Sequence, residues 1–293
     1  MVSIEGIIPV VLTPFNKAQE LDENALRVMV KRFIEKGVHG LFCLGTNGEF
    51  FSMTTDEKIK VISIVVDEAK GKLPIYAGSG GISTKEVIYL SQTFEKMGVD
   101  VLSIITPYFL PFTQDELIQH YTMVAKSTSL PILLYNIPSK TGLSLEPSTV
   151  KELAKLPNIV GIKDSSGDFN LMQKYIDVTS SEFACLAGSD ALILQTLMAG
   201  GKGGVSGTSN VLTDEMLALY HNWQNGNIDE ATRIQQSLQP LIDIYSSHTL
   251  PSVIKEACNM IGIPAGMSRL PVSPLSKETR DKLQKVLIHY KKL

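Results

Sequence analysis

Lys163 comes directly after the apolar run NIVGI and before the polar run DSSGD. If the apolar run is an inner strand, this lysine is buried, and burial lowers its pKa because a low-dielectric environment disfavours the ammonium form. A neutral amine can attack a carbonyl to give a Schiff base, which allows a carbon–carbon bond to form or break without a metal. At the end of an exposed edge strand, the same lysine would be only a solvated charge.

Two further motifs could take part in such chemistry. Tyr135 ends the apolar run PILLY, and a phenol there could move protons to and from the carbinolamine oxygen. A lone tyrosine at this place is equally typical of a core residue with a wet hydroxyl. In the segment GTNGE, Gly45 and Gly48 let backbone N–H groups approach an anion such as a substrate carboxylate, although an ordinary tight turn has the same pattern.

Short apolar runs alternate with amphipathic helical segments along the chain, and this alternation predicts the elements that would position these residues. Buried strands separated by helices pair in parallel through right-handed crossovers. Eight such units predict an α/β fold, a closed (β/α)8 TIM barrel, whose active site lies at the carboxyl ends of the strands. An open doubly wound sheet is the competitor, but LTPFNK after the first run lacks its glycine fingerprint. The expected strands are residues 6–12, 40–44, 74–78, 101–105, 131–135, 158–163, 183–187 and 203–207.

The barrel is expected to occupy residues 1–211. Residues 212–293 contain only helical patterns, including the segment 227–247, and they predict the last barrel helix followed by a C-terminal helical extension. No low-complexity linker separates the two parts.

Composition excludes several classes of partner. The net charge of −3 and the pI near 6.0 give no positive field for nucleic acid. No apolar run approaches the roughly 18 residues that would cross a bilayer, and the N-terminal segment does not resemble a signal peptide, so we expect a cytoplasmic protein without membrane contacts. The three cysteines and five histidines are scattered in the sequence, which predicts no metal site.

Taken together, five motifs resemble those of the dihydrodipicolinate synthase and N-acetylneuraminate lyase family, in the same order and over nearly the whole chain. They are GTNGE, TPYF, YNIPSKTG, GIKDSSGD and GGVSGTSN. The resemblance implies a class I aldolase, a carbon–carbon lyase that handles pyruvate and an aldehyde on a barrel. It also implies a covalent Schiff base in place of a cofactor, and a homotetramer built as a dimer of dimers.

The matched motifs also imply roles for single residues. Lys163 would form the Schiff base, Tyr135 would shuttle protons, and Thr46 would be its hydroxyl partner. The backbone of Thr46 and Asn47 would hold the pyruvate carboxylate, and Gly188 and Val205 would line the same pocket.

Departures from the family pattern bear on the substrate. The synthases resemble YNxPSRTG, with an arginine that grips the carboxylate of aspartate semialdehyde, whereas this chain has Lys140, which cannot make the planar two-pronged contact. Phe109 replaces the second tyrosine after TP and has no hydroxyl for the proton relay, and Asn47 replaces a threonine.

Other departures resemble the sugar-acid branch. Ser165 stands where the synthases have alanine, and Asp190 could accept a hydrogen bond from a sugar hydroxyl, with Ser206 also expected near the mouth. The residues therefore favour an aldolase for a 2-keto-3-deoxy sugar acid. The alternative is dihydrodipicolinate synthase (4-hydroxy-tetrahydrodipicolinate synthase), which joins pyruvate and aspartate semialdehyde. A non-catalytic, ligand-binding relative is a third possibility, suggested by Phe109.

The loop YFLPF, residues 108–112, is apolar throughout, which indicates an interface in an oligomer. Alternatively, it could fold back onto its own barrel.

Overall fold

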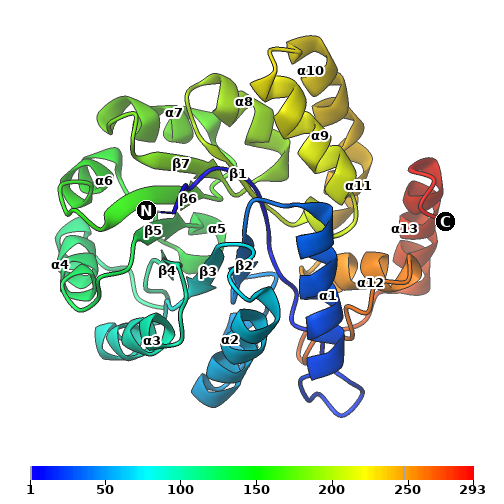
Figure 1. The fold of residues 1–293 in the computed structure, drawn as a ribbon, viewed down its shortest axis with the longest axis horizontal. Coiled ribbons are helices and arrows are strands. Elements are labelled where there is room, and N and C mark those ends of the chain that lie inside the picture. The colour runs from blue at the N-terminus through cyan, green and yellow to red at the C-terminus, as the bar shows by residue number, and fades with distance from the viewer. Residues whose placement is uncertain (1, 247) are drawn as a thin grey trace.

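The computed structural model describes residues 2–246 and 248–293, and over these residues it is a TIM barrel, as the sequence predicts (Figure 1). The eight strands found there are parallel and follow the order β1-β8-β7-β6-β5-β4-β3-β2. A single bridge between Val10 and Phe42 brings the first strand to the second. The strands are β1 (Gly6–Pro9), β2 (Leu41–Cys43), β3 (Ile75–Gly78), β4 (Val101–Ile105), β5 (Ile132–Asn136), β6 (Ile159–Asp164), β7 (Ala184–Ala187) and β8 (Gly203–Ser206).

The strand ends differ from the predicted ones by a few residues. The largest difference is in β1, which was expected over residues 6–12 and ends at Pro9. Beyond it, Val10 makes only the bridge to Phe42, and the Val11 N–H donates to Phe42 O at 2.8 Å. The apolar run continues because these residues are buried at the barrel mouth, and burial alone does not require a ladder.

Two apolar layers hold the barrel together because side chains alternate along each strand. One set of buried residues fills the interior of the ring, and the other packs outward under the helices. The interior cluster is Ile8, Val10, Phe42, Tyr76, Val101, Leu133, Leu186 and Val205.

Helices surround the strands, and sequence signals explain where several of them begin (Figure 1). In α2, for example, Thr54 and Glu57 form a capping box, with Thr54 N donating to Glu57 Oε2 at 2.8 Å. The helices up to β8 are α1 (Glu23–Lys36), α2 (Thr55–Ala69), α3 (Thr84–Lys96), α4 (Gln114–Ala125), α5 (Pro138–Thr141), α6 (Pro147–Leu153), α7 (Phe169–Val178) and α8 (Ile193–Met198), with 3-10 turns η1 (Phe50–Ser52) and η2 (Asp190–Leu192).

After β8 the described chain is helical, as predicted. These elements are η3 (Thr208–Asn210), α9 (Thr213–Gln224), α10 (Ile228–Ser237), α11 (Gln239–Ser246), α12 (Ser252–Met260) and α13 (Lys277–His289). The segment 227–247, which has a helical pattern in the sequence, contains two helices, since α10 ends at Ser237 and α11 begins at Gln239 with Pro240 in its first turn. The last residue of that segment, 247, lies outside the described residues, and the boundary at 211 stays a prediction.

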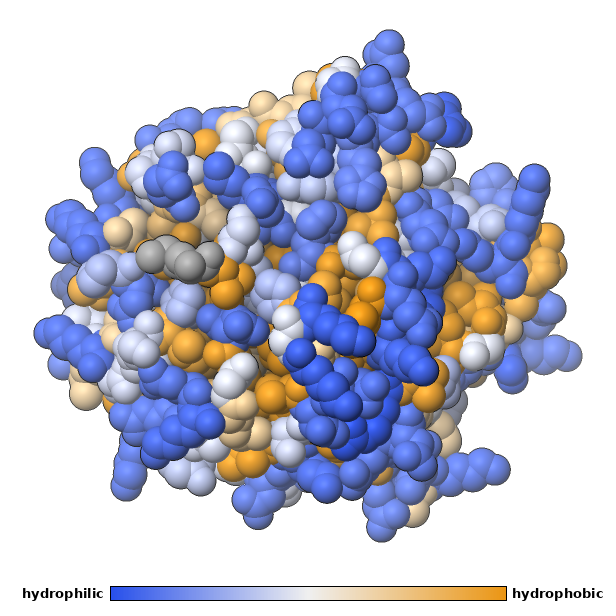
Figure 2. All heavy atoms as spheres, viewed as in Figure 1, coloured by the Kyte–Doolittle hydropathy of each residue, from blue (hydrophilic) through white to orange (hydrophobic). Residues whose placement is uncertain are grey.

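Hydrophilic side chains cover most of the face seen in Figure 2, and hydrophobic residues appear between them. Among the described residues, no helix is long and apolar enough to cross a membrane.

Gly161 tests how tightly β6 fits between its neighbours. A Cβ at this position would lie 2.4 Å from the backbone oxygen of Ala184 and 2.7 Å from Leu133. We expect Gly161→Ala to destabilise the fold by about 1–3 kcal/mol, since the clash is with backbone. The control is Gly81→Ala, whose Cβ would meet at 3.2 Å only the flexible end of Glu86. Equal shifts of the urea unfolding midpoint in the two variants would contradict this packing.

Candidate active site

Lys163 is buried at the carboxyl end of β6, with 3% of its surface exposed. Its Nζ lies 4.2 Å from the ring centroid of Phe42 and 4.0 Å from that of Tyr135. Burial lowers the pKa of Lys163, and Tyr135 opposes this shift through its charge and a hydrogen bond. The lysine is therefore easier to deprotonate than an exposed one, as its use as a nucleophile requires.

Tyr135 and Thr46 form a hydroxyl pair beside the lysine. Tyr135 lies opposite Lys163 in the register of β5 and β6, and its Oη is 3.0 Å from Thr46 Oγ1. Because either hydroxyl can be the donor, the pair can pass a proton in either direction. The predicted trio is thus brought together from β2's loop, β5 and β6.

The turn after β2 carries Thr46 and Asn47 into the same pocket. It is closed by a hydrogen bond of 3.1 Å from Glu49 N to Thr46 O. Over the described residues, the N–H groups of Thr46 and Asn47 have no acceptor within the protein. Free N–H groups at a pocket wall can receive an anion such as a carboxylate.

Ser165 and Gly188 meet across the ends of β6 and β7. Gly188 N donates to Asp164 O at 2.7 Å, and a Cβ on Gly188 would come within 1.9 Å of Ser165 Oγ. A larger residue at 188 would therefore require the Ser165 hydroxyl to move. Asp164 itself is held by Asn136 Nδ2 at 2.7 Å and Ser166 Oγ at 2.6 Å, and its burial raises its pKa.

Asp190 also borders the pocket, whereas Ser206 does not. Asp190 Oδ2 accepts a hydrogen bond of 2.8 Å from Thr208 N, and burial raises the pKa of this carboxyl group. Ser206 was expected near substrate, but its Oγ accepts from Ser209 N at 3.0 Å. The reason is the alternation along β8, where the preceding Val205 takes the inward position.

One pocket of about 320 Å3 joins the other predicted residues at the barrel mouth. It contains Lys163, Tyr135, Thr46, Asn47, Lys140, Ser165, Gly188, Asp190 and Val205, with Lys140 exposed at the rim. Several lining residues were not predicted: Val10, Ile137, Ser139, Gly167, Ser189, Gly207, Ile242, Tyr245, Leu250 and Ile254. Ser139 and Ser189 adjoin predicted residues, but those from α11 and α12 come from distant chain that no local motif marks.

A hollow of about 430 Å3 lies at the opposite end of the barrel, where the strands begin. It is lined by residues such as Ile4, Phe183 and Lys202 and contains none of the predicted site residues. Within residues 2–246 and 248–293, no three His, Cys, Asp or Glu side chains are grouped to hold a metal ion.

A buried lysine beside a phenol at the mouth of a (β/α)8 barrel is the arrangement of a Schiff-base aldolase. The family model "Dihydrodipicolinate synthetase family" matches residues 3–290. The chain belongs to this family, and it is a carbon–carbon lyase of the class I, pyruvate-dependent aldolase type.

Individual relatives match this chain over nearly its full length. The chain is 37% identical to the 4-hydroxy-tetrahydrodipicolinate synthase of Methanopyrus kandleri, covering 97% of this chain and 95% of the relative. A solved dihydrodipicolinate synthase is 36% identical with a TM-score of 0.95, covering 99% of this chain and 100% of that one. The prophage protein YagE of E. coli K12, a family member solved in complex with pyruvate, is 32% identical with a TM-score of 0.95, covering 99% of both chains.

The burial of Lys163 predicts how imine formation depends on pH. Its lowered pKa means that the neutral amine accumulates at a lower pH than in an exposed lysine. The rate of imine formation with pyruvate should therefore fall as the pH falls through this lowered pKa. Intact mass after cyanoborohydride trapping at a series of pH values gives the midpoint.

Tyr135→Phe serves as the internal comparison, because Tyr135 raises the pKa of Lys163. The variant should move the midpoint to a lower pH. A midpoint equal to that of an exposed lysine would contradict the assigned environment.

Proposed function

We propose that this protein joins pyruvate to an aldehyde, or cleaves the product, through a Schiff base on Lys163. The observation that carries the proposal is the buried amine between the Phe42 and Tyr135 rings, next to the hydroxyl pair of Tyr135 and Thr46. No external cofactor takes part, since the lysine itself is the covalent group.

The residues would act in the following order. Lys163 Nζ attacks C2 of pyruvate, and Tyr135 protonates the carbinolamine oxygen so that water leaves. The iminium then loses a proton from the pyruvate methyl group, and the resulting enamine attacks the aldehyde carbon. Hydrolysis returns the free amine. The N–H groups of Thr46 and Asn47 would hold the pyruvate carboxylate throughout.

For the aldehyde, we propose aspartate semialdehyde. After the carbon–carbon bond has formed, its amino group would attack C2 in place of water, displace the Lys163 amine and close the ring, so that the product is 4-hydroxy-tetrahydrodipicolinate. The sequence alone favoured a sugar acid, but relatives 35–37% identical over nearly the whole chain are named 4-hydroxy-tetrahydrodipicolinate synthase. The ammonium of Lys140 at the pocket rim could attract the carboxylate of that aldehyde, as a single point charge.

A 2-keto-3-deoxy sugar acid is the second candidate substrate. The observation in its favour is the polar wall of the pocket, where Ser139, Ser165 and Ser189 stand near Asp190. Hydroxyl and carboxylate groups of this kind suit the successive hydroxyls of a sugar chain.

Trapping with borohydride tests the central step. Wild type incubated with pyruvate and borohydride should gain the mass of one reduced pyruvyl group, whereas Lys163→Ala should gain none, because the other described lysine of the pocket, Lys140, is exposed at its rim. Lys202→Ala is the matched control, since this partly buried lysine lies at the far end of the barrel. A wild type without adduct would refute the proposal and favour the non-catalytic, ligand-binding alternative.

The aldehyde is tested by comparing rates of carbon–carbon bond formation. Aspartate semialdehyde should give the higher kcat/KM, and Lys140→Ala should lower it by about tenfold, within the range of a charge-assisted contact of roughly 1.5–3 kcal/mol. The rate with a neutral sugar-derived aldehyde should change less. Faster turnover of the sugar aldehyde by wild type would reverse the order of the two candidates.

We also propose a homotetramer. Phe109 is 88% exposed and Leu110 54% exposed on the loop after β4, with Phe51 and Ile82 also exposed on neighbouring loops. Light scattering should show an oligomer at micromolar protein, and Phe109→Ser with Leu110→Ser should weaken it because less apolar surface would be buried. Ile288→Ser, on α13, is the control. A wild-type monomer would contradict this assembly.

A further inference from the structure

Glu49 ends the turn that carries Thr46 and Asn47, yet its side chain faces away from the pocket into the protein. It is fully buried, with 0% of its surface exposed, and its backbone has φ +58°, the left-handed region that a non-glycine residue rarely adopts. Such a conformation persists only where surrounding contacts determine it. The contacts of the Glu49 carboxylate therefore fix the shape of the turn.

Lys255, on α12, supplies the first of these contacts. Its Nζ donates to Glu49 Oε1, to Thr13 O at 2.6 Å and to Met267 O at 2.8 Å. The ammonium group thus uses its full set of three donors, and only 1% of the residue is exposed. An ammonium held by three fixed acceptors is a rigid anchor for the carboxylate.

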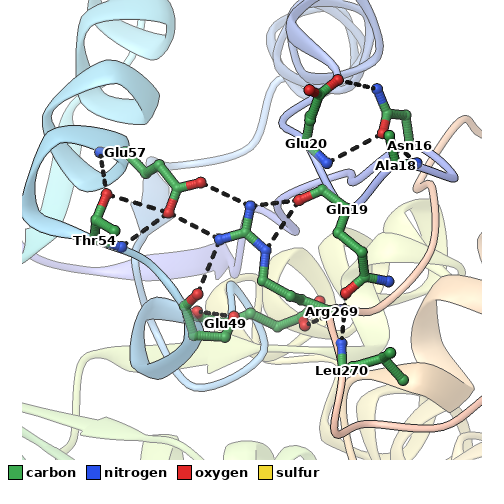
Figure 3. A network of polar contacts seen from close by, with 10 residues as sticks. Asn16, Ala18, Gln19, Glu20, Glu49, Thr54, Glu57, Arg269 and Leu270 are labelled. Atoms are coloured by element: carbon green, nitrogen blue, oxygen red, sulfur yellow. Dashed lines mark hydrogen bonds and ion pairs between the residues drawn. The ribbon is translucent and has the colours of Figure 1, made fainter.

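Arg269 supplies the second contact. Its backbone N–H donates to Glu49 Oε2 at 2.8 Å, so both carboxylate oxygens of Glu49 are occupied by the C-terminal extension. The guanidinium is fixed separately, between the Gln19 carbonyl and the Glu57 carboxylate, as Figure 3 shows. Arg269 therefore lies in a rigid position from which its backbone can hold Glu49.

Thr13 holds the turn from the other side. Its Oγ1 donates to Gly48 O at 2.7 Å, while its own carbonyl accepts from Lys255. Gly48 and Glu49, the last two residues of the turn, are thus tied to one cluster. Glu49 N in turn bonds to Thr46 O at 3.1 Å, which connects the cluster to the residue that pairs with Tyr135.

We infer that Glu49 and Lys255 are a positioning pair, through which the C-terminal extension holds the 46–49 turn in the geometry that receives the substrate carboxylate. This inference rests on the proposed function, because it assumes that pyruvate binds at Lys163 and at the turn. Neither side chain lines the pocket, so both act through the backbone of Thr46 and Asn47.

Such a pair can contribute by fixing the geometry of the 46–49 turn. A buried ion pair adds little to stability compared with apolar residues of similar volume, because both charges lose their hydration. It does fix the orientation of the carboxylate, since each hydrogen bond here joins one donor and one acceptor at defined positions. A displacement of about 1 Å in a bound substrate can change the rate of its reaction by about a hundredfold.

The test compares two ketones at Lys163. Pyruvate needs the turn for its carboxylate, whereas acetone has no carboxylate and needs only the amine. The ratio of their borohydride trapping rates therefore reports on the turn, and a general loss of fold would lower both rates together. The variants are Glu49→Gln and Lys255→Met. Glu256→Gln is the control, because it removes a carboxylate from the same helix as Lys255, where Glu256 pairs with Arg280 and not with the turn.

We expect Glu49→Gln and Lys255→Met to lower the pyruvate-to-acetone ratio by about tenfold or more, with Glu256→Gln close to wild type. If a charge-changing variant does not fold, Thr13→Val is decisive, since it is isosteric and removes only the hydroxyl that holds Gly48 O. Its ratio should fall in the same direction.

An unchanged ratio in folded Glu49→Gln and Thr13→Val would overturn the positioning role while leaving the proposed function intact. Absence of any pyruvate adduct on wild type would instead refute the proposed function itself.

Discussion

The site depends on the removal of one amine from water. Lys163 is placed by β6 between two aromatic rings, where no carboxylate contacts its nitrogen and where burial lowers its pKa. The barrel makes this possible because its interior is already filled with apolar side chains from the other strands. The packing that stabilises the fold therefore also lowers the pKa of the reactive amine.

The helices after β8 are part of the site as much as the barrel is. Ile242, Tyr245, Leu250 and Ile254 contribute apolar surface to the pocket that contains the amine. Lys255 lies in the same helix as Ile254 but points to the buried face of the turn after β2. One helix thus contributes both a wall of the pocket and a support behind it.

The alternation of strands and helices and about half of the pocket lining could be predicted from the sequence, because parallel strands bring their carboxyl ends together whatever the loops contain. Lys163 and Tyr135 follow from that rule alone. Ser206 was expected at the pocket but does not line it, because adjacent residues of a strand face opposite ways, and a one-residue choice cannot be made without the register. Tyr245 could not be predicted, since its place is set by packing between elements distant in sequence.

The contact between Gly188 and Ser165 has an evolutionary consequence. A Cβ at 188 would lie 1.9 Å from Ser165 Oγ and 3.0 Å from both Asp164 O and Ser165 Cβ, so alanine at 188 requires at least that the Ser165 hydroxyl move away. The effects of substitutions at 165 and 188 are therefore expected to depend on each other. Laboratory evolution towards bulkier aldehydes would meet this epistasis, and libraries that vary the two positions together would sample combinations that stepwise selection at position 188 alone penalises.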